Sequence, residues 1–314
     1  MRAATIRDQQ IVIEDHPDPE PGTGEVLVRV RAAGLNGADM LQRKGLYPPP
    51  PGAPQDIPGL ELAGEVAALG PAASRFKAGD RVMAIVAGGA QAELAVVHER
   101  VLMPVPRNLD WAAAGGVPEV FTTAHDAVFT QAGLQPGERL LVHGGAGGVG
   151  TAAVQLGRAT GARVAATVRN PDLRQGVVAL GAEVIAPEDF SQHGPFDVIL
   201  ELVGAPNLGE NVKALEVGGR ITVIGIGAGA TGELNLGLLM AKRARIHGST
   251  LRARPLESKA LTARAMERSV LPLLAAGQVR VPVAATYPLD RAAEAYERFA
   301  AGGKLGKIVL VVPG

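Results

Sequence analysis

The chain has 314 residues, 47% hydrophobic and 20% charged, which is enough for two ordinary domains or one large one. Its 31 basic and 31 acidic residues cancel, and only 3% of residues are aromatic, so the composition argues against binding nucleic acid or an anionic membrane. The absence of cysteine excludes disulfides, cysteine nucleophiles and thiolate zinc sites. Because no stretch of about 18 uninterrupted apolar residues occurs, we expect a cytoplasmic protein.

The first hundred residues show short apolar runs separated by glycine and proline turns. Strands are predicted at 3–6, 11–14, 25–33, 60–69, 81–86 and 91–97. This spacing is typical of a small β-barrel. One helix is predicted at 37–43, with Asn36 as its N-cap and Gly45 as its stop.

A rigid loop follows this helix, in which Tyr47 precedes four consecutive prolines. Proline fixes φ and favours an extended polyproline geometry. Such a loop can be a simple spacer. It can also hold the tyrosine against a cleft, where the side chain presents an aromatic face and a hydroxyl.

From about Trp111, apolar runs alternate with helical segments. Strands are predicted at 139–143, 163–168, 183–186, 197–203, 220–225 and 245–248. This alternation predicts a parallel, doubly wound sheet and thus an α/β domain. Beyond it we predict a helix over 256–276 despite Pro272, a helix over 290–300 capped by Asp290, and a last strand at 307–312.

A glycine-rich turn joins the first strand of this domain to the helix that follows. It consists of Gly145, Ala146, Gly147, Gly148, Val149 and Gly150. In the pattern G-x-G-x-x-G the first glycine makes the turn, the second admits a pyrophosphate and the third lets helix pack on strand. The phosphates would lie on a helix N-terminus, whose free N–H groups bind anions. A plain turn between buried elements is the less favoured interpretation.

The end of the next predicted strand indicates which dinucleotide is bound. An NAD site places Asp or Glu there to hold the ribose 2′-hydroxyl, whereas this strand ends in Arg169 and Asn170. Arg169, helped by Asn170 and Arg174, can pair with a 2′-phosphate. We therefore expect NADPH, the alternative being an arginine on a solvated loop.

The order of motifs along the chain resembles one known family. The motifs are Ala33-Gly34-Leu35-Asn36 with Asp39, Gly45-Leu46-Tyr47-Pro48-Pro49-Pro50, Gly59-Leu60-Glu61, Ala78-Gly79-Asp80-Arg81-Val82, the glycine turn and Gly306-Lys307-Ile308-Val309-Leu310. They resemble the zinc-independent, zeta-crystallin-like quinone oxidoreductases of the medium-chain dehydrogenase/reductase superfamily. Residues 89–93 and 117–119 are most similar to the stress-inducible quinone reductase subgroup.

The resemblance implies a GroES-like β-barrel domain, residues 1–119 and 256–314, and a Rossmann domain, residues 120–255. It implies that Asn36 and Asp39 lie near the nicotinamide, although both residues can equally serve only to start their helix. It further implies that Thr123, Gly225 and Gly227 contact the cofactor. Zinc-dependent relatives carry Cys near position 36, His near position 60 and a four-cysteine loop, none of which occurs here, so no metal is expected.

The resemblance also implies the reaction. A quinone accepts hydride from NADPH without a metal, and Tyr47, at the mouth of a cleft between domains, can donate to the quinone oxygen. Two alternatives stay open: reduction of an activated C=C bond, as in enoyl reductases, and a crystallin-like or AU-rich RNA-binding role. The family implies a homodimer, which we place at residues 245–248. His125 and His143 are interpreted as structural, because the six histidines lack metal spacing.

Overall fold

The computed structural model describes residues 1–313, which divide into two compact units. The first unit comprises residues 1–122, 251–302 and the strand from Lys307 onward; the second comprises 123–250 and 303–306. The expected boundaries, 119/120 and 255/256, differ from these by three and five residues. The short return of residues 303–306 to the second unit is not among the predictions.

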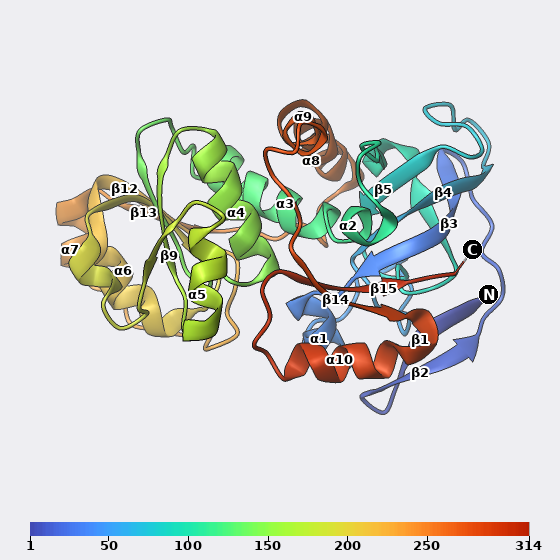
Figure 1. Cartoon of the computed structure of the whole chain (residues 1–314), viewed down its shortest axis with the longest axis horizontal. Coiled ribbons are helices and arrows are strands. Elements are labelled where there is room, and N and C mark those ends of the chain that lie inside the picture. Colours follow the sequence, from blue (N-terminus) through green and yellow to red (C-terminus); the bar gives the residue numbers. More distant parts are fainter. Residues whose placement is uncertain (314) are drawn as a thin grey trace. The chain divides into compact units, whose positions relative to one another are not determined.

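Both ends of the chain contribute to the main sheet of the first unit (Figure 1). Its path is β14-β15-β3-β4-β5-β7, and β6 also pairs with β3. The strands are β3 (Glu25–Gly34), β4 (Glu61–Leu69), β5 (Arg81–Ile85), β6 (Leu94–His98), β7 (Met103–Pro104), β14 (Val283–Pro288) and β15 (Lys307–Val311). A separate hairpin is formed by β1 (Arg2–Arg7) and β2 (Gln10–Asp15). All pairs are antiparallel except β14 with β15.

The core of the first unit follows from alternation along β3. Val26, Val28 and Val30 are fully buried, as a strand with one face toward a core requires. Helix α10 (Ala292–Ala300) covers this core with Tyr296, whose buried hydroxyl donates to Gln91 Oε1 at 2.9 Å. The other helices are α1 (Gly37–Arg43), α2 (Trp111–Gly115), α3 (Pro118–His125, which ends in the second unit), α8 (Leu256–Ser269) and α9 (Leu271–Ala275).

The second unit contains a six-stranded, fully parallel sheet, which confirms the predicted α/β architecture. Its strands are β8 (Arg139–Val142), β9 (Arg163–Thr167), β10 (Glu183–Ile185), β11 (Phe196–Glu201), β12 (Leu215–Val223) and β13 (Arg245–Gly248). The order β10-β9-β8-β11-β12-β13 is the 3-2-1-4-5-6 order of dinucleotide-binding folds. The order reverses between β8 and β11, and ligands bind at the carboxyl ends of such strands.

Helices cover both faces of this sheet. Leu140 and Val164 face α4 (Gly148–Ala159), since a side chain at Gly157 would lie 2.9 Å from both. The neighbouring Leu141 and Ala165 point to the other face, where they pack with α6 (Leu208–Ala214) and α7 (Leu236–Lys242). Helix α5 (Pro171–Val178) follows β9, and a π-helix (Asp126–Gln131) follows α3. Short 3-10 helices span Glu99–Val101, Phe190–His193, Ala205–Asn207 and Leu289–Arg291.

Two predicted helices are wrong in detail, and one strand was not predicted. The helix expected over 256–276 is two helices that break at Val270, because Pro272 fits the first turn of a new helix but not the interior of a longer one. Helix α10 begins after a 3-10 turn with Arg291 at its N-cap, so Asp290 does not cap it. Strand β14 was not predicted; its terminal Pro288 is tolerated because β14 is an edge strand.

Candidate functional site

The glycine turn links β8 to α4 in the second unit, as predicted. Gly147 is the N-cap of α4, and its N–H donates to the Gly144 carbonyl oxygen at 3.0 Å. The left-handed backbone position is Gly144, with a φ of +68°, rather than Gly145. A side chain at Gly145 would instead lie 2.7 Å from the Cβ of Ala166 in β9. Both glycines are therefore needed, Gly144 for the turn and Gly145 for contact with the neighbouring strand.

Gly150 has the packing role expected of the third glycine. A Cβ there would lie 2.8 Å from the Gly145 Cα and would overlap the Gly144 carbonyl oxygen. The first intrahelical bond runs from the Thr151 N–H to the Gly147 carbonyl at 2.8 Å. The N–H groups of Gly148, Val149 and Gly150 precede it, so they are the free donors of this helix start.

The turn is braced by a segment from far along the chain. The Gly306 N–H donates to the Ala146 carbonyl oxygen at 2.8 Å, and Gly306 pairs with Gly147 in an isolated parallel bridge. No local pattern in the sequence signals this contact, because the partners are 160 residues apart (306 − 146). The contact holds the backbone of the turn through main-chain atoms alone, so the side chains there carry little information about it.

Arg169 lies just after the end of β9 (Arg163–Thr167). Its side chain is exposed and makes no hydrogen bond or ion pair within residues 1–313. Asn170 is the N-cap of α5, where its Oδ1 accepts from the Asp172 N–H at 3.0 Å. Arg174 reaches back from α5, and its Nε donates to the Val168 carbonyl at 3.2 Å. The structure thus brings the three predicted phosphate-binding residues to one strand end and leaves the Arg169 guanidinium available.

Gly225 lies at the neighbouring end of β12. Its N–H donates to the Glu201 carbonyl at 3.1 Å, and a Cβ there would overlap the backbone of Leu202. Gly227 has open space where its side chain would be. Thr123, in α3, is 6% exposed. Because β11 pairs with both β8 and β12, and the Gly225 N–H binds Glu201, the ends of these three strands meet at one edge of the sheet.

A buried polar network supports the same edge. Glu201, at the end of β11, accepts from the N–H groups of Val203 and Gly204 at 2.6 and 2.8 Å. His143 Nε2 contacts Asn211 Oδ1 at 2.7 Å, and Asn211 Nδ2 donates to Glu201 at 2.8 Å. Burial lowers the pKa of His143, which favours the neutral ring. His143 is thus a structural histidine, as interpreted, while Glu201 and Asn211 were missed by sequence reasoning.

In the first unit, Asn36 belongs to a buried charged cluster. Its Oδ1 accepts from Lys307 Nζ at 2.6 Å, and its Nδ2 donates to Glu61 Oε1 at 3.0 Å. Lys307 and Glu61 form an ion pair at 2.6 Å, with side-chain exposures of 2% and 0%. Both polar atoms of the Asn36 amide are therefore already hydrogen-bonded within the protein. Neither Glu61 nor Lys307 was singled out as a site residue in the sequence.

Asp39 lies beside this cluster, fully buried in the first turn of α1. Its carboxylate accepts from the Asn36 N–H at 2.8 Å and from the Gly59 N–H at 3.2 Å. Burial raises the pKa of Asp39 from 3.8 to about 6, although the two N–H groups and Lys307 oppose this. Asn36 and Asp39 thus start the helix together, and Asp39 also anchors the Gly59 loop.

Tyr47 is held by a buried arginine rather than by its proline run alone. The Arg252 guanidinium lies 5.1 Å from the ring centroid of Tyr47 and donates to the Tyr47 carbonyl at 2.9 Å. Arg252 also donates to Gln42 Oε1 at 2.5 Å and to the Ala87 carbonyl at 2.8 Å. Burial raises the pKa of the Tyr47 hydroxyl, so this hydroxyl is a donor at neutral pH.

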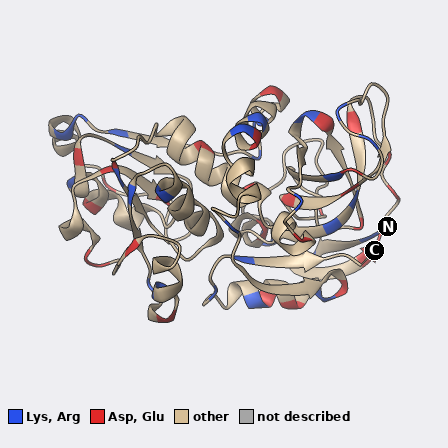
Figure 2. Ribbon diagram, turned by 45° about the horizontal axis from the view of Figure 1, so that its top comes forward, with Lys and Arg blue, Asp and Glu red and all other residues tan. Residues whose placement is uncertain are grey.

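Within residues 1–313, no group of three or more His, Cys, Asp or Glu side chains is placed to hold a metal ion. Nor does any described helix combine the length and apolar character that crossing a membrane requires. Figure 2 shows Lys and Arg interspersed with Asp and Glu along the ribbon of each unit, in keeping with the balanced composition.

Comparison with known families gives two matches. The sequence pattern described as an alcohol dehydrogenase GroES-like domain matches residues 22–107, and the one described as a zinc-binding dehydrogenase matches residues 180–310. Among curated relatives, a quinone oxidoreductase of Rattus norvegicus is 32% identical over 94% of this chain and 91% of its own length. A quinone oxidoreductase of Pseudomonas aeruginosa is 34% identical over 95% and 94%.

Solved structures agree on the fold. An NAD-dependent alcohol dehydrogenase, 29% identical, superposes with a TM-score of 0.87 over 100% of both chains. A mycobacterial protein solved with NADPH, 26% identical, also gives 0.87 over 99% and 100%. A segment amounting to 5% of a polyketide synthase from Streptomyces halstedii is 34% identical over 92% of this chain. The expected pairing of a GroES-like domain with a Rossmann domain is thus confirmed.

Proposed function

The chain is an oxidoreductase of the quinone oxidoreductase branch of the medium-chain dehydrogenase/reductase superfamily, and from this membership we propose that it reduces quinones with NADPH and without a metal. The observation that carries the proposal is the glycine turn at the β8/β11 reversal, with Arg169 at the adjacent strand end.

Two groups on the second unit suit a dinucleotide phosphate. The free N–H groups at the start of α4 suit the pyrophosphate, since a helix N-terminus carries partial positive charge. The unpaired Arg169 suits a 2′-phosphate, with Arg174 and Asn170 beside it. The structural neighbours named above include an NAD-dependent and an NADPH-bound protein, so the preference for NADPH rests on Arg169.

When bound, the reduced nicotinamide supplies a hydride to the acceptor. For Tyr47 we assign the role of hydrogen-bond donor to the quinone oxygen, which gains negative charge as hydride arrives. Arg252 positions Tyr47 through its carbonyl and its ring. We assign Asn36 and Asp39 a structural role in the first unit, because their polar atoms already bind Lys307, Glu61 and backbone N–H groups. No proton relay through the protein is required, because water can protonate the product.

Assembly as a homodimer is part of the proposal. β13 ends the six-stranded sheet, and its outer edge has no strand partner within the described chain. Exposed edges favour pairing with a second copy. Light scattering of a dilute sample checks this, because a stable and active monomer would contradict it.

One assay panel tests the function. Oxidation of NADPH and NADH is followed with ortho-quinones, para-quinones and an enoyl thioester, in EDTA-treated and zinc-supplemented protein. We expect fastest turnover with NADPH and a quinone, unchanged by EDTA. Turnover with the enoyl thioester alone would support the second candidate, reduction of an activated C=C bond, which the polyketide synthase match favours. Dependence on zinc would refute the metal-free mechanism.

A further inference from the structure

A chain of buried hydrogen bonds begins at the glycine turn and ends at Glu201. The Gly144 N–H lies 3.2 Å from Thr167 Oγ1, and the same Oγ1 lies 3.1 Å from His143 Nδ1. On its other side, the His143 ring contacts Asn211, which donates to Glu201. The four side chains are between 0% and 3% exposed, so these bonds are shielded from water.

The direction of this chain is fixed at Glu201. A carboxylate only accepts hydrogen bonds, and it has about four places to do so. In Glu201 these are taken by the N–H groups of Val203 and Gly204 and by the side-chain amides of Asn207 and Asn211. The amide nitrogen of Asn211 therefore faces Glu201, and its Oδ1 faces His143 Nε2 at 2.7 Å. Because Oδ1 is an acceptor, the ring proton lies on Nε2.

This assignment also fixes the role of the Thr167 hydroxyl. Burial lowers the pKa of His143, so at neutral pH the ring carries no second proton and its Nδ1 is an acceptor. The Thr167 hydroxyl therefore donates to Nδ1, and its oxygen accepts from the Gly144 N–H. The main-chain carbonyl of Thr167 accepts from the Gly145 N–H at 3.0 Å. One residue thus holds two successive N–H groups of the turn.

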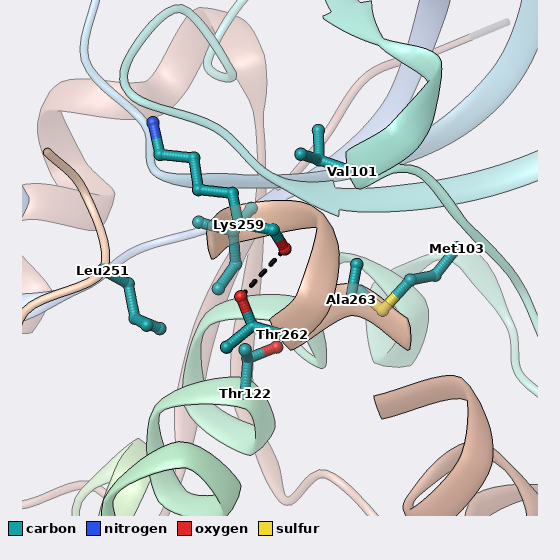
Figure 3. Close-up of a pocket in the computed structure, with 8 residues that line it drawn as sticks. Val101, Met103, Thr122, Leu251, Lys259, Thr262 and Ala263 are labelled. Atoms are coloured by element: carbon teal, nitrogen blue, oxygen red, sulfur yellow. Dashed lines mark hydrogen bonds between the residues drawn. The ribbon is translucent and has the colours of Figure 1, made fainter. Parts of the chain in front are cut away.

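Two other threonines show that burial alone does not produce such a contact. Thr122, in α3, is 3% exposed, and its Oγ1 has no partner among the described residues. Thr262 Oγ1 donates to the Lys259 carbonyl of its own helix, α8, at 2.8 Å (Figure 3). Thr167 differs from both, because it lies at the end of β9 and binds the backbone of the loop after β8.

We propose that Thr167 is a positioning residue for the dinucleotide and acts on it through the glycine turn. This role rests on the proposed function, since it presupposes a dinucleotide at the turn. A turn held by Thr167 presents the free N–H groups of α4 in one arrangement, so binding does not have to order the turn first. NADPH and NADH carry the same pyrophosphate, so Thr167 serves both equally. Arg169, two residues further along, distinguishes them instead.

Fluorescence titration of Thr167→Val with NADPH and NADH tests this role. Valine has nearly the shape of threonine but no hydroxyl, which leaves the Gly144 N–H and His143 Nδ1 unpaired. If the turn then holds its binding conformation about one tenth of the time, both affinities fall about tenfold. We expect Thr167→Ser, which keeps the hydroxyl, to restore both affinities. Thr262→Val, the matched control, should bind both cofactors as the native chain does, because that hydroxyl serves only its own helix.

A second measurement needs neither a cofactor nor the valine variant. Nitrogen-15 NMR of the native, cofactor-free chain at neutral pH distinguishes the two neutral tautomers of histidine. The His143 signals are assigned by elimination, with His→Gln variants of the other five histidines. We expect the Nε2–H form. The Nδ1–H form would make the Thr167 hydroxyl an acceptor from the ring and would overturn the proposal even if Thr167→Val does not fold.

The binding results separate this role from the proposed function. Unchanged affinities in Thr167→Val, or a loss confined to NADPH, would overturn the role of Thr167 and leave the proposed function in place. A native chain that binds neither dinucleotide would refute the proposed function, and this role with it.

Discussion

The Lys307 ammonium lies 2.6 Å from Glu61 Oε1 and pairs with it where both side chains are almost wholly buried. Lys307 comes from β15 and Glu61 from β4, and both bind the amide of Asn36 between them. Removing one member of such a pair leaves an unpaired buried charge, which typically costs about 3–5 kcal/mol. The pair therefore ties the C-terminal strand to the N-terminal half of the unit.

Lys307→Met should accordingly lower the free energy of unfolding by about 3–5 kcal/mol, because the Glu61 carboxyl would be left buried without its partner. Urea denaturation measures this. The matched control is Arg291→Met, which breaks an exposed pair with Glu294 and should leave the free energy of unfolding nearly unchanged. Equal effects of the two variants would show that the buried pair contributes no more to the free energy of unfolding than the exposed pair does.

Asp39 should make stability depend on pH. Its pKa is about 6 in the folded chain against 3.8 ordinarily, so between these values the folded state holds a proton that the unfolded state has released. This contribution to stability is therefore present below about pH 4 and is lost as pH rises through 6. At about 1.4 kcal/mol per pKa unit, the loss is on the order of 3 kcal/mol.

Denaturation curves of the native chain and Asp39→Asn, recorded from pH 4 to 7, test this. The difference between the two should change over that window, because Asn carries no titratable proton. An unchanged difference would mean that Asp39 is already ionised throughout the range.

Arg169 should determine cofactor preference. A charge-assisted hydrogen bond contributes about 1.5–3 kcal/mol, so Arg169→Ala should weaken NADPH binding at least about tenfold and leave NADH binding nearly unchanged. Fluorescence titration with each cofactor measures both constants. Arg163→Ala, at the exposed start of the same strand, is the control and should affect neither. An equal loss for both cofactors would contradict the assignment of the 2′-phosphate to Arg169.

Tyr47 should act on turnover through its hydroxyl. Tyr47→Phe should lower kcat for ortho-quinones with little change in NADPH affinity, while Tyr47→Ala should also raise the quinone KM through lost packing. Steady-state kinetics separates these effects. Wild-type turnover in Tyr47→Phe would mean that the hydroxyl has no chemical role and that Tyr47 contributes only the packing of its ring.

The sequence alone determined the features that depend on local pattern. The alternation of apolar runs and helices predicted the parallel sheet, and the glycine spacing placed the turn before α4. Both signals depend only on residues that are neighbours in the sequence. The Asn36 cap and the strand end at Arg169 followed in the same way. Even there, one detail differs: the turn was expected at Gly145, whereas the left-handed residue in the structure is Gly144.

Only the tertiary structure decided what depends on distant partners. Asn36 is committed to Lys307, 271 residues away, and Tyr47 is held by Arg252, 205 residues away. Glu201, Asn211 and Gly306 support the glycine turn and the neighbouring strand ends through contacts that no local pattern marks. Burial likewise raises the pKa of Asp39 and leaves Thr122 unpaired, because desolvation is set by everything that packs around a group rather than by its neighbours in sequence.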